Sequence, residues 1–230
     1  MNIQILQLLE GAKEATGLTV IIDVFRAFST ACYAYEKGAA NIIPVENIEE
    51  AYMIKNNNPE YLLMGERNEM RPHGFNFGNS PAHLLNADLT GKTLVHTTSS
   101  GTRGIVSASN AQQVITGSFV NAGAIINYIK TSHPDVVSLV CMGYACEYAT
   151  DEDTLCAEYI KNELEGRSND FNKYIEIIRK GSGKRFFNPD SQDWAPSLDF
   201  ELCLKLNRFD FILKEEKDNN RRCLKKISVG

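Results

Sequence analysis

Short runs of β-branched and other apolar residues alternate along the chain with segments of helical composition. Six runs predict buried strands, at residues 19–23, 41–45, 61–64, 93–97, 113–117 and 135–142. Helical segments follow most of them, at residues 29–37, after Asn47, and at residues 101–108, 121–130 and 151–164. Repeated strand–loop–helix units with short connections predict an α/β fold, with a mostly parallel sheet and helices on both faces.

Beyond Gly166 the alternation weakens. Residues 180–196 are rich in Gly, Pro, Asn and Asp and predict a long surface loop. Residues 200–213 alternate apolar and polar positions and are expected to return to the body. The last segment, residues 214–230, carries six basic and three acidic side chains, and we expect a frayed tail or an edge element. A length of 230 residues suits one domain spanning residues 1–230.

The charge of the chain narrows the classes of partner. Lys and Arg total 24 and Asp and Glu total 29, so the net charge is −5, and without the basic tail it is −8. A nucleic-acid-binding protein would need a basic face, so we expect no nucleic-acid partner. No apolar run reaches the roughly 18–20 residues of a membrane span. The N-terminus lacks signal-peptide features, and the six cysteines form no CxxC pair, which predicts reduced thiols in a cytoplasmic protein.

Polar motifs fall where the predicted strands end, which is where α/β sheets bind ligands. Asp23 ends the first strand and could bind Mg²⁺ or attack a phosphorus atom. Arg26, three residues later, could form a bidentate contact with phosphate oxygens. The alternative is an acid at a helix start that pairs with a surface arginine.

A second motif follows the third predicted strand. Gly65 is followed by Glu66 and Arg67, and a glycine-containing loop leads on to Asn79 and Ser80. Long loops of this kind often carry function. The alternative is a compact surface loop whose glycines only permit its turns.

The third motif, residues 97–103, contains four successive hydroxyl side chains before a glycine and an arginine. Hydroxyls and backbone N–H groups at a helix start form an anion site. Simple capping would need only one hydroxyl, so the excess favours anion binding. Its candidate contact residues are Thr98, Ser99, Ser100, Gly101, Thr102 and Arg103.

Two further motifs are weaker. Ser118 and Asn121 follow the fifth predicted strand and could add a hydroxyl and an amide, or could simply cap a helix. The acids of residues 151–153 are stabilised at a helix start whatever their function, although such carboxylates also suit Mg²⁺.

The ordered set of motifs resembles the 2-phosphosulfolactate phosphatase family over roughly residues 19–164. The resemblance implies a three-layer α/β/α sandwich and a Mg²⁺-dependent acid phosphatase. The implied reaction releases phosphate from 2-phospho-3-sulfolactate and leaves 3-sulfolactate, a step of coenzyme M biosynthesis. The chain departs from the family pattern at Ser100, at Asn76, in residues 69–73 and in the loop 180–196, which leaves the exact substrate open.

We therefore expect a phosphatase with a small anionic phosphorylated substrate and Mg²⁺ as cofactor. Asp23, Arg26, Glu66 and Arg103 are the expected catalytic residues, and Asp23 could be nucleophile, base or metal ligand. The expected Mg²⁺ ligands are Asp23, Glu66 and Asp153. The expected substrate contacts are Arg67, Asn79, Ser80, Thr98, Ser99, Ser100, Gly101, Thr102, Ser118 and Asn121.

A second class of function remains open at this point. A non-catalytic phosphosugar- or anion-binding module could use a similar Ser/Thr-Gly loop, with the acids serving as helix caps. The four arginines among the first 166 residues all lie in or beside the motifs, which favours a small, multiply charged ligand under either reading. A homodimer is expected only from its general frequency.

Overall fold

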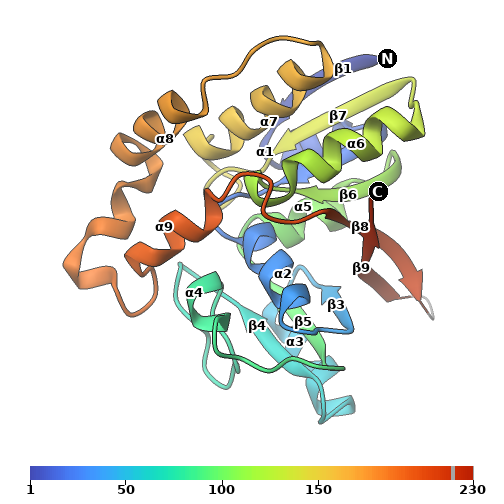
Figure 1. Cartoon of the computed structure of the whole chain (residues 1–230). Coiled ribbons are helices and arrows are strands. Elements are labelled where there is room, and N and C mark those ends of the chain that lie inside the picture. The colour runs from blue at the N-terminus through green and yellow to red at the C-terminus, as the bar shows by residue number, and fades with distance from the viewer. Residues whose placement is uncertain (219–220, 230) are drawn as a thin grey trace.

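The chain folds around one nine-stranded sheet, shown in Figure 1. The computed structural model describes residues 1–218 and 221–229, and the sheet, its helices and their contacts lie within these ranges. The strand order is β1-β7-β2-β6-β8-β9-β3-β5-β4. The strands in that order are β1 (Asn2–Gln7), β7 (Val136–Cys141), β2 (Gly17–Ile22), β6 (Ala111–Gly117), β8 (Phe211–Asp218), β9 (Arg221–Ser228), β3 (Asn41–Pro44), β5 (Thr93–Thr97) and β4 (Leu62–Gly65).

Two groups of parallel strands make up most of the sheet. One group is β1, β7, β2 and β6, and the other is β3, β5 and β4. The hairpin β8–β9 lies between them and pairs antiparallel with both, at two positions of β6 and at one position of β3. The sheet is therefore mixed, and its two parallel groups meet through a narrow junction.

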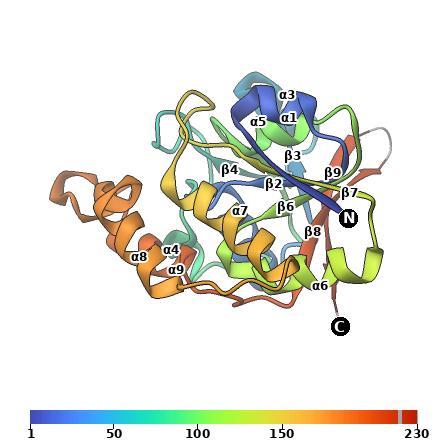
Figure 2. The same cartoon turned by 90° about the horizontal axis from the view of Figure 1, so that it is seen from above.

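Helices cover both faces of the sheet, as Figure 2 shows. Helices α1, α3 and α5 lie on one side, and α6, α7, α8 and α9 lie on the other. Their bounds, with those of α2 and α4, are α1 (Leu8–Glu14), α2 (Ala27–Glu36), α3 (Ile48–Asn57), α4 (Pro81–Leu84), α5 (Gly101–Ser107), α6 (Ala122–Ser132), α7 (Asp151–Leu164), α8 (Phe171–Lys180) and α9 (Ser197–Cys203). This arrangement confirms the predicted three-layer α/β/α sandwich.

The central strand β2 shows why the sheet needs both layers. Leu18, Val20 and Ile22 pack into the cluster that contains α6 and α7, while Ile21 packs into the cluster on the other side. All six residues of β2 are buried. A strand buried on both faces reads as a continuous apolar run, which is the pattern that identified it in the sequence.

The six predicted strands and their helices are confirmed, with ends that shift by a few residues. The elements that were not predicted include β1, α1, α4, α8 and α9. Strand β1 is an edge strand of which no residue is fully buried, so it lacks a clear apolar run. Helix α1 has seven residues, and in α8 only Ile178 is fully buried.

The prediction of a frayed or edge tail is wrong. Strand β9 lies inside the sheet, where Leu224 is fully buried and pairs with Ile42. The Tyr35 hydroxyl donates a hydrogen bond to the Leu224 carbonyl. This strand was not recognised in the sequence because lysines and arginines flank its two buried residues, Cys223 and Leu224, and give the segment a net positive charge.

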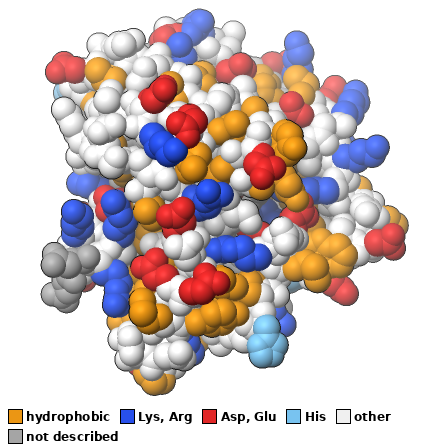
Figure 3. All heavy atoms as spheres, turned by 180° about the vertical axis from the view of Figure 1, so that it is seen from behind, with side chains coloured by type: hydrophobic (Ala, Val, Ile, Leu, Met, Phe, Trp, Pro, Cys, Tyr) orange, Lys and Arg blue, Asp and Glu red, His pale blue; other side chains and the backbone are white. Residues whose placement is uncertain are grey.

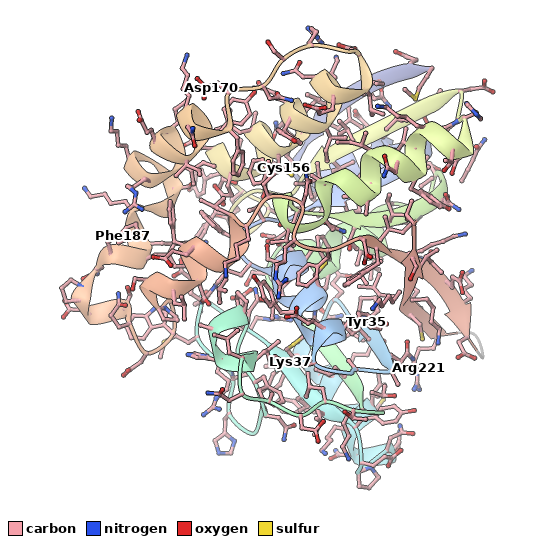
Figure 4. All side chains as sticks on the ribbon, viewed as in Figure 1. Tyr35, Lys37, Cys156, Asp170, Phe187 and Arg221 are labelled. Carbon is pink, nitrogen blue, oxygen red and sulfur yellow. The ribbon has the colours of Figure 1, made fainter. Side chains whose placement is uncertain are left out.

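The segment 180–196 is also more ordered than the predicted surface loop. It contains two 3₁₀ turns, η2 (Ser182–Phe187) and η3 (Pro189–Ser191), which form the outer turn between α8 and α9 at the left of Figure 1. Phe186 is fully buried beneath it, whereas Phe187, labelled in Figure 4, is exposed. One aromatic ring thus anchors a polar segment to the body.

Two further predictions concern features of the whole chain. None of the helices in the described ranges is both long and apolar enough to cross a bilayer. The six cysteines form no disulfide with one another.

On the face shown in Figure 3, acidic and basic side chains are interspersed.

The role of β9 can be tested by substitution. Leu224→Ala should lower the free energy of unfolding by about 2–5 kcal/mol, because it leaves a cavity at a fully buried position. Urea unfolding followed by circular dichroism measures this. Lys217→Ala on the exposed part of β8 is the control and should change stability by less than about 0.5 kcal/mol. Equal stability of the two variants would contradict the place given to β9.

Candidate active site

A cavity lies at the carboxyl ends of β2, β4, β5 and β7, where loops from both parallel groups of the sheet meet. Thirteen residues line it, most of them polar or charged. They are Asp23, Phe25, Arg26, Glu66, Asn68, Glu69, Asn79, Ser99, Ser100, Gly143, Tyr144, Ala145 and Arg185.

Asp23 stands directly after β2 with its carboxyl group at the cavity. The backbone N–H of Ala27 donates to its Oδ1 at 3.0 Å. Gly101 packs so closely that an added Cβ would lie 2.8 Å from Oδ2, so α5 must begin with glycine here. Burial, together with repulsion from Glu66 and Glu152, raises the pKa of Asp23 to about 7. A carboxyl group that titrates near neutral pH can exchange a proton with a reacting group.

Glu66 follows β4 and holds two loops together. Its Oε1 accepts from the Ser99 N–H at 2.6 Å, and its Oε2 accepts from the Ser99 hydroxyl at 3.1 Å and from the Glu69 N–H at 2.9 Å. Gly65 precedes it with a φ of 144°, and a Cβ there would collide with the Thr97 carbonyl oxygen. Glycine thus lets β4 and β5 end side by side and brings Glu66 onto the hydroxyl-rich loop.

Asp153 and Glu152 lie at the start of α7, behind the cavity wall. Asp153 accepts from the Val24 N–H through Oδ1 and from the Gly143 N–H through Oδ2, both at 2.8 Å. Burial is the main cause that raises the pKa of both acids. Both oxygens of Asp153 are occupied by backbone amides, and it does not line the cavity, so its present role is to hold the loops after β2 and β7.

Arg26 lines the cavity but is already bound by the protein. Its Nη1 donates to Asp199 at 2.8 Å and to the Trp194 carbonyl at 2.5 Å, and both side chains of the ion pair are buried. The Ser80 hydroxyl donates to the other oxygen of Asp199 at 2.8 Å. Asp199 was not identified from the sequence, because an acid in the first turn of a short helix carries no distinguishing pattern.

The hydroxyl-rich loop divides into cavity-lining and supporting residues. Ser99 and Ser100 face the cavity, and Ser100 Oγ accepts from the Cys146 N–H at 3.1 Å. Thr98 and Thr102 are buried and bond each other, with the Thr98 N–H 2.9 Å from Thr102 Oγ1. The two threonines shape the loop that presents the serines.

Six other predicted residues are not among those that line the cavity, namely Ser80, Gly101, Ser118, Asn121, Arg67 and Arg103. Ser118 and Asn121 form a buried capping box, with the Ser118 N–H 3.1 Å from Asn121 Oδ1. Arg67 donates to Thr97 Oγ1 at 2.6 Å and to the Glu46 carbonyl at 2.9 Å. Arg103 lies 3.6 Å from Glu46 at the surface.

Asn79, which was predicted, and Arg185, which was not, both reach the cavity. Asn79 Oδ1 is buried and has no hydrogen-bond partner in the described part of the chain. Arg185 lies in η2, donates to Glu69 Oε1 at 2.8 Å and brings a second guanidinium group to the cavity. The only signal for it in the sequence is the pair Phe186-Phe187, which suggests that the segment packs against the body.

No group of three or more His, Cys, Asp or Glu side chains stands ready to hold a metal ion within residues 1–218 and 221–229. Three carboxylates, Asp23, Glu66 and Glu69, do line the cavity, and Glu69 is paired with Arg185. Mg²⁺ commonly binds through one or two carboxylates, with water and substrate phosphate completing its shell. The donor set therefore fits Mg²⁺ shared with a phosphorylated ligand.

Comparison with known proteins identifies the group to which this architecture belongs. A family model described as 2-phosphosulpholactate phosphatase matches residues 3–218. A probable 2-phosphosulfolactate phosphatase of Bacillus subtilis is 30% identical over 215 residues, which cover 92% of each chain. One from Clostridium tetani is 35% identical over 214 residues, covering 90% of this chain and 91% of that protein. One from Thermotoga maritima is 36% identical over 163 residues, covering 69% and 70%.

These matches favour a phosphatase over a non-catalytic anion-binding module. The family model extends over the whole cavity up to Arg185 and beyond it to α9 and β8. The chain therefore belongs to the 2-phosphosulfolactate phosphatase family and is a phosphoric monoester hydrolase.

Proposed function

We propose that this enzyme hydrolyses 2-phospho-3-sulfolactate, or a closely related small phosphorylated acid, to 3-sulfolactate and inorganic phosphate, and that it uses Mg²⁺. The names of the relatives support the substrate. The observation that carries the proposal is the buried carboxyl group of Asp23, which lines the cavity together with Glu66. The expected place in coenzyme M biosynthesis, the cytoplasmic location and a homodimer stay predictions.

The charges around the cavity support a metal requirement. Asp23, Glu66 and Glu69 line it together with Arg26 and Arg185. Each arginine is already paired with an acid, Arg26 with Asp199 and Arg185 with Glu69. A phosphate dianion entering here would meet an excess of negative charge unless a cation came with it. Asp23 and Glu66 would hold Mg²⁺, which when bound neutralises phosphoryl oxygens.

The chain's own groups then act on the phosphate ester. Ser100 presents its hydroxyl proton to a phosphoryl oxygen, because its oxygen already accepts from Cys146. Asp23 has two routes. It can take the proton of an attacking water, or its carboxylate can itself attack phosphorus. In the first route, the water oxygen bonds to phosphorus as the bond between phosphorus and the C2 oxygen breaks, and the proton taken by Asp23 passes to that oxygen, which becomes the hydroxyl group of sulfolactate. In the second route, the C2 oxygen leaves with a proton from solvent, and a water molecule then attacks the phosphorus of the phosphorylated Asp23, which releases phosphate and restores the carboxylate.

Asp23→Asn tests the central assignment. The amide cannot take up a proton or attack phosphorus, so phosphate release should fall by about 10²–10⁴-fold or more. A phosphate-release assay with phosphosulfolactate measures this, and circular dichroism checks the fold. Asp190→Asn, at an exposed acid of η3, is the matched control and should keep full activity. Near-normal turnover by Asp23→Asn would remove this residue from the chemistry.

The metal requirement is tested by removal. Chelation with EDTA should abolish phosphate release, and added Mg²⁺ should restore it. Calorimetric titration should show weaker Mg²⁺ binding in Glu66→Gln than in the parent protein, because one of the two proposed carboxylate ligands is lost. Full turnover in EDTA would exclude the metal from the proposal.

The raised pKa of Asp23 predicts a pH-dependent difference in stability. The folded state keeps this proton up to about pH 7, whereas an ordinary Asp loses it near 3.8. The resulting stabilisation is fully present below the lower value and is lost as pH rises through the higher one. In metal-free protein, the melting temperature of Asp23→Asn relative to the parent should therefore increase from pH 5 to pH 8. A constant difference across that range would contradict the burial of a titrating carboxyl group.

A further inference from the structure

Arg185 reaches the cavity from a segment that the rest of the site does not use. The segment is anchored from below, because the Phe186 ring is fully buried and lies 4.8 Å, centroid to centroid, from the ring of Phe25. Phe25 itself follows Asp23 in the loop after β2. The backbone of Arg185 is therefore fixed relative to the loop after β2, although 160 residues of sequence separate Arg185 from Phe25.

The guanidinium group of Arg185 is oriented but not saturated. Its Nη1 donates to Glu69 Oε1 at 2.8 Å, and its Nη2 donates to the Phe25 carbonyl at 3.1 Å. It lies between the rings of Tyr144 and Phe186, 5.6 Å and 5.2 Å from their centroids. Its Nε is buried and has no partner among the described residues. Only two of its five N–H donors are used in these contacts.

Arg26 differs from Arg185 in this respect. Its side chain is 3% exposed and its Nη1 donates to both Asp199 and the Trp194 carbonyl. The side chain of Arg185 is 24% exposed, and its partner Glu69 is 22% exposed. Of the two guanidinium groups that line the cavity, that of Arg185 is the more exposed and the better placed to contact a ligand.

The contacts of Arg185 are not with the two acids proposed to hold the metal and the phosphate. Its hydrogen bonds go to Glu69 and the Phe25 carbonyl, and it lies against the rings of Tyr144 and Phe186. The proposed function places the phosphate at Asp23 and Glu66. The non-reacting end of the substrate then extends toward Arg185, Glu69 and Tyr144.

We propose, on the basis of the proposed function, that Arg185 binds the sulfonate group of the substrate and sets the preference for a sulfonated acid. A sulfonate has three equivalent oxygens and stays charged at every physiological pH. The planar and weakly hydrated guanidinium group suits such an oxyanion better than a lysine ammonium group does. Glu69 keeps the guanidinium group in place before the substrate enters.

The test compares two substrates that differ only in the sulfonate. In 2-phospholactate a methyl group replaces the sulfomethyl group of phosphosulfolactate. Arg185→Ala should lower kcat/KM for phosphosulfolactate by at least about tenfold more than for phospholactate, because a hydrogen-bonded charge pair is lost with only one of them. The loss should lie mainly in KM, and Arg185→Lys should recover part of it.

Arg179→Ala is the matched control. Arg179 stacks on Phe187 and Phe200 beside the same segment, at 4.6 Å and 4.8 Å from the ring centroids, but it is not among the residues that line the cavity. Its removal should leave the ratio of the two kcat/KM values unchanged. Equal losses for both substrates in Arg185→Ala would overturn the proposal and assign Arg185 a role in holding the loop.

Binding of the product separates this proposal from the proposed function. Calorimetry should show that Arg185→Ala weakens binding of 3-sulfolactate by at least about tenfold and leaves binding of inorganic phosphate unchanged. If the parent protein hydrolysed neither substrate, the proposed function would fail, and sulfolactate binding would still decide the role of Arg185. Unchanged sulfolactate binding in Arg185→Ala would refute that role.

Discussion

Backbone amides that hold buried carboxylates are the interaction on which the site depends. A carboxylate taken out of water must be hydrogen-bonded, and several carboxylates taken out together also repel one another. Asp23, Glu66 and Asp153 meet this requirement through N–H groups of the loops that follow β2, β4, β5 and β7. Each acid therefore fixes a loop, and the loops in turn fix the shape of the cavity.

This requirement explains the unusual backbone around the cavity. Asn68 and Glu69 have φ values of 52° and 67°, and Ala145 and Cys146 have 53° and 60°. Left-handed conformations of non-glycine residues are uncommon and cluster at functional sites. Here they allow the Glu69 N–H to reach Glu66 and the Cys146 N–H to reach Ser100.

Much of the sheet could be predicted from the sequence because buried strands leave a local pattern. Val20 and Ile22 mark β2 without reference to any other part of the chain, and Asp23 then falls at its end. The same reasoning brings Glu66, Ser99 and Ser100 to one edge of the sheet, where the structure also places them. Strand ends are local features, and a motif that follows one is positioned by it.

Two features could not be predicted. One is the direction in which long side chains point, and the other is which distant segments of the chain fold back onto the site. Arg67 and Arg103 stand beside the right strands, but Glu46 and Thr97 draw them away from the cavity. Arg185 and Asp199 come from segments without a strand pattern, and only tertiary packing brings them to the loop after β2. Leu224 is missed for a related reason, since a strand flanked by charges resembles a solvated tail.

The position of the β8–β9 hairpin bears on how the chain folds as it is synthesised. The hairpin is the junction between the two parallel groups of strands, and it is translated after all of them. Until the hairpin has been made, the edges of β6 and β3 that pair with it have no partner, and unpaired strand edges are open to wrong partners. Because the cavity draws residues from both groups, their alignment across it depends on the strands that are made last.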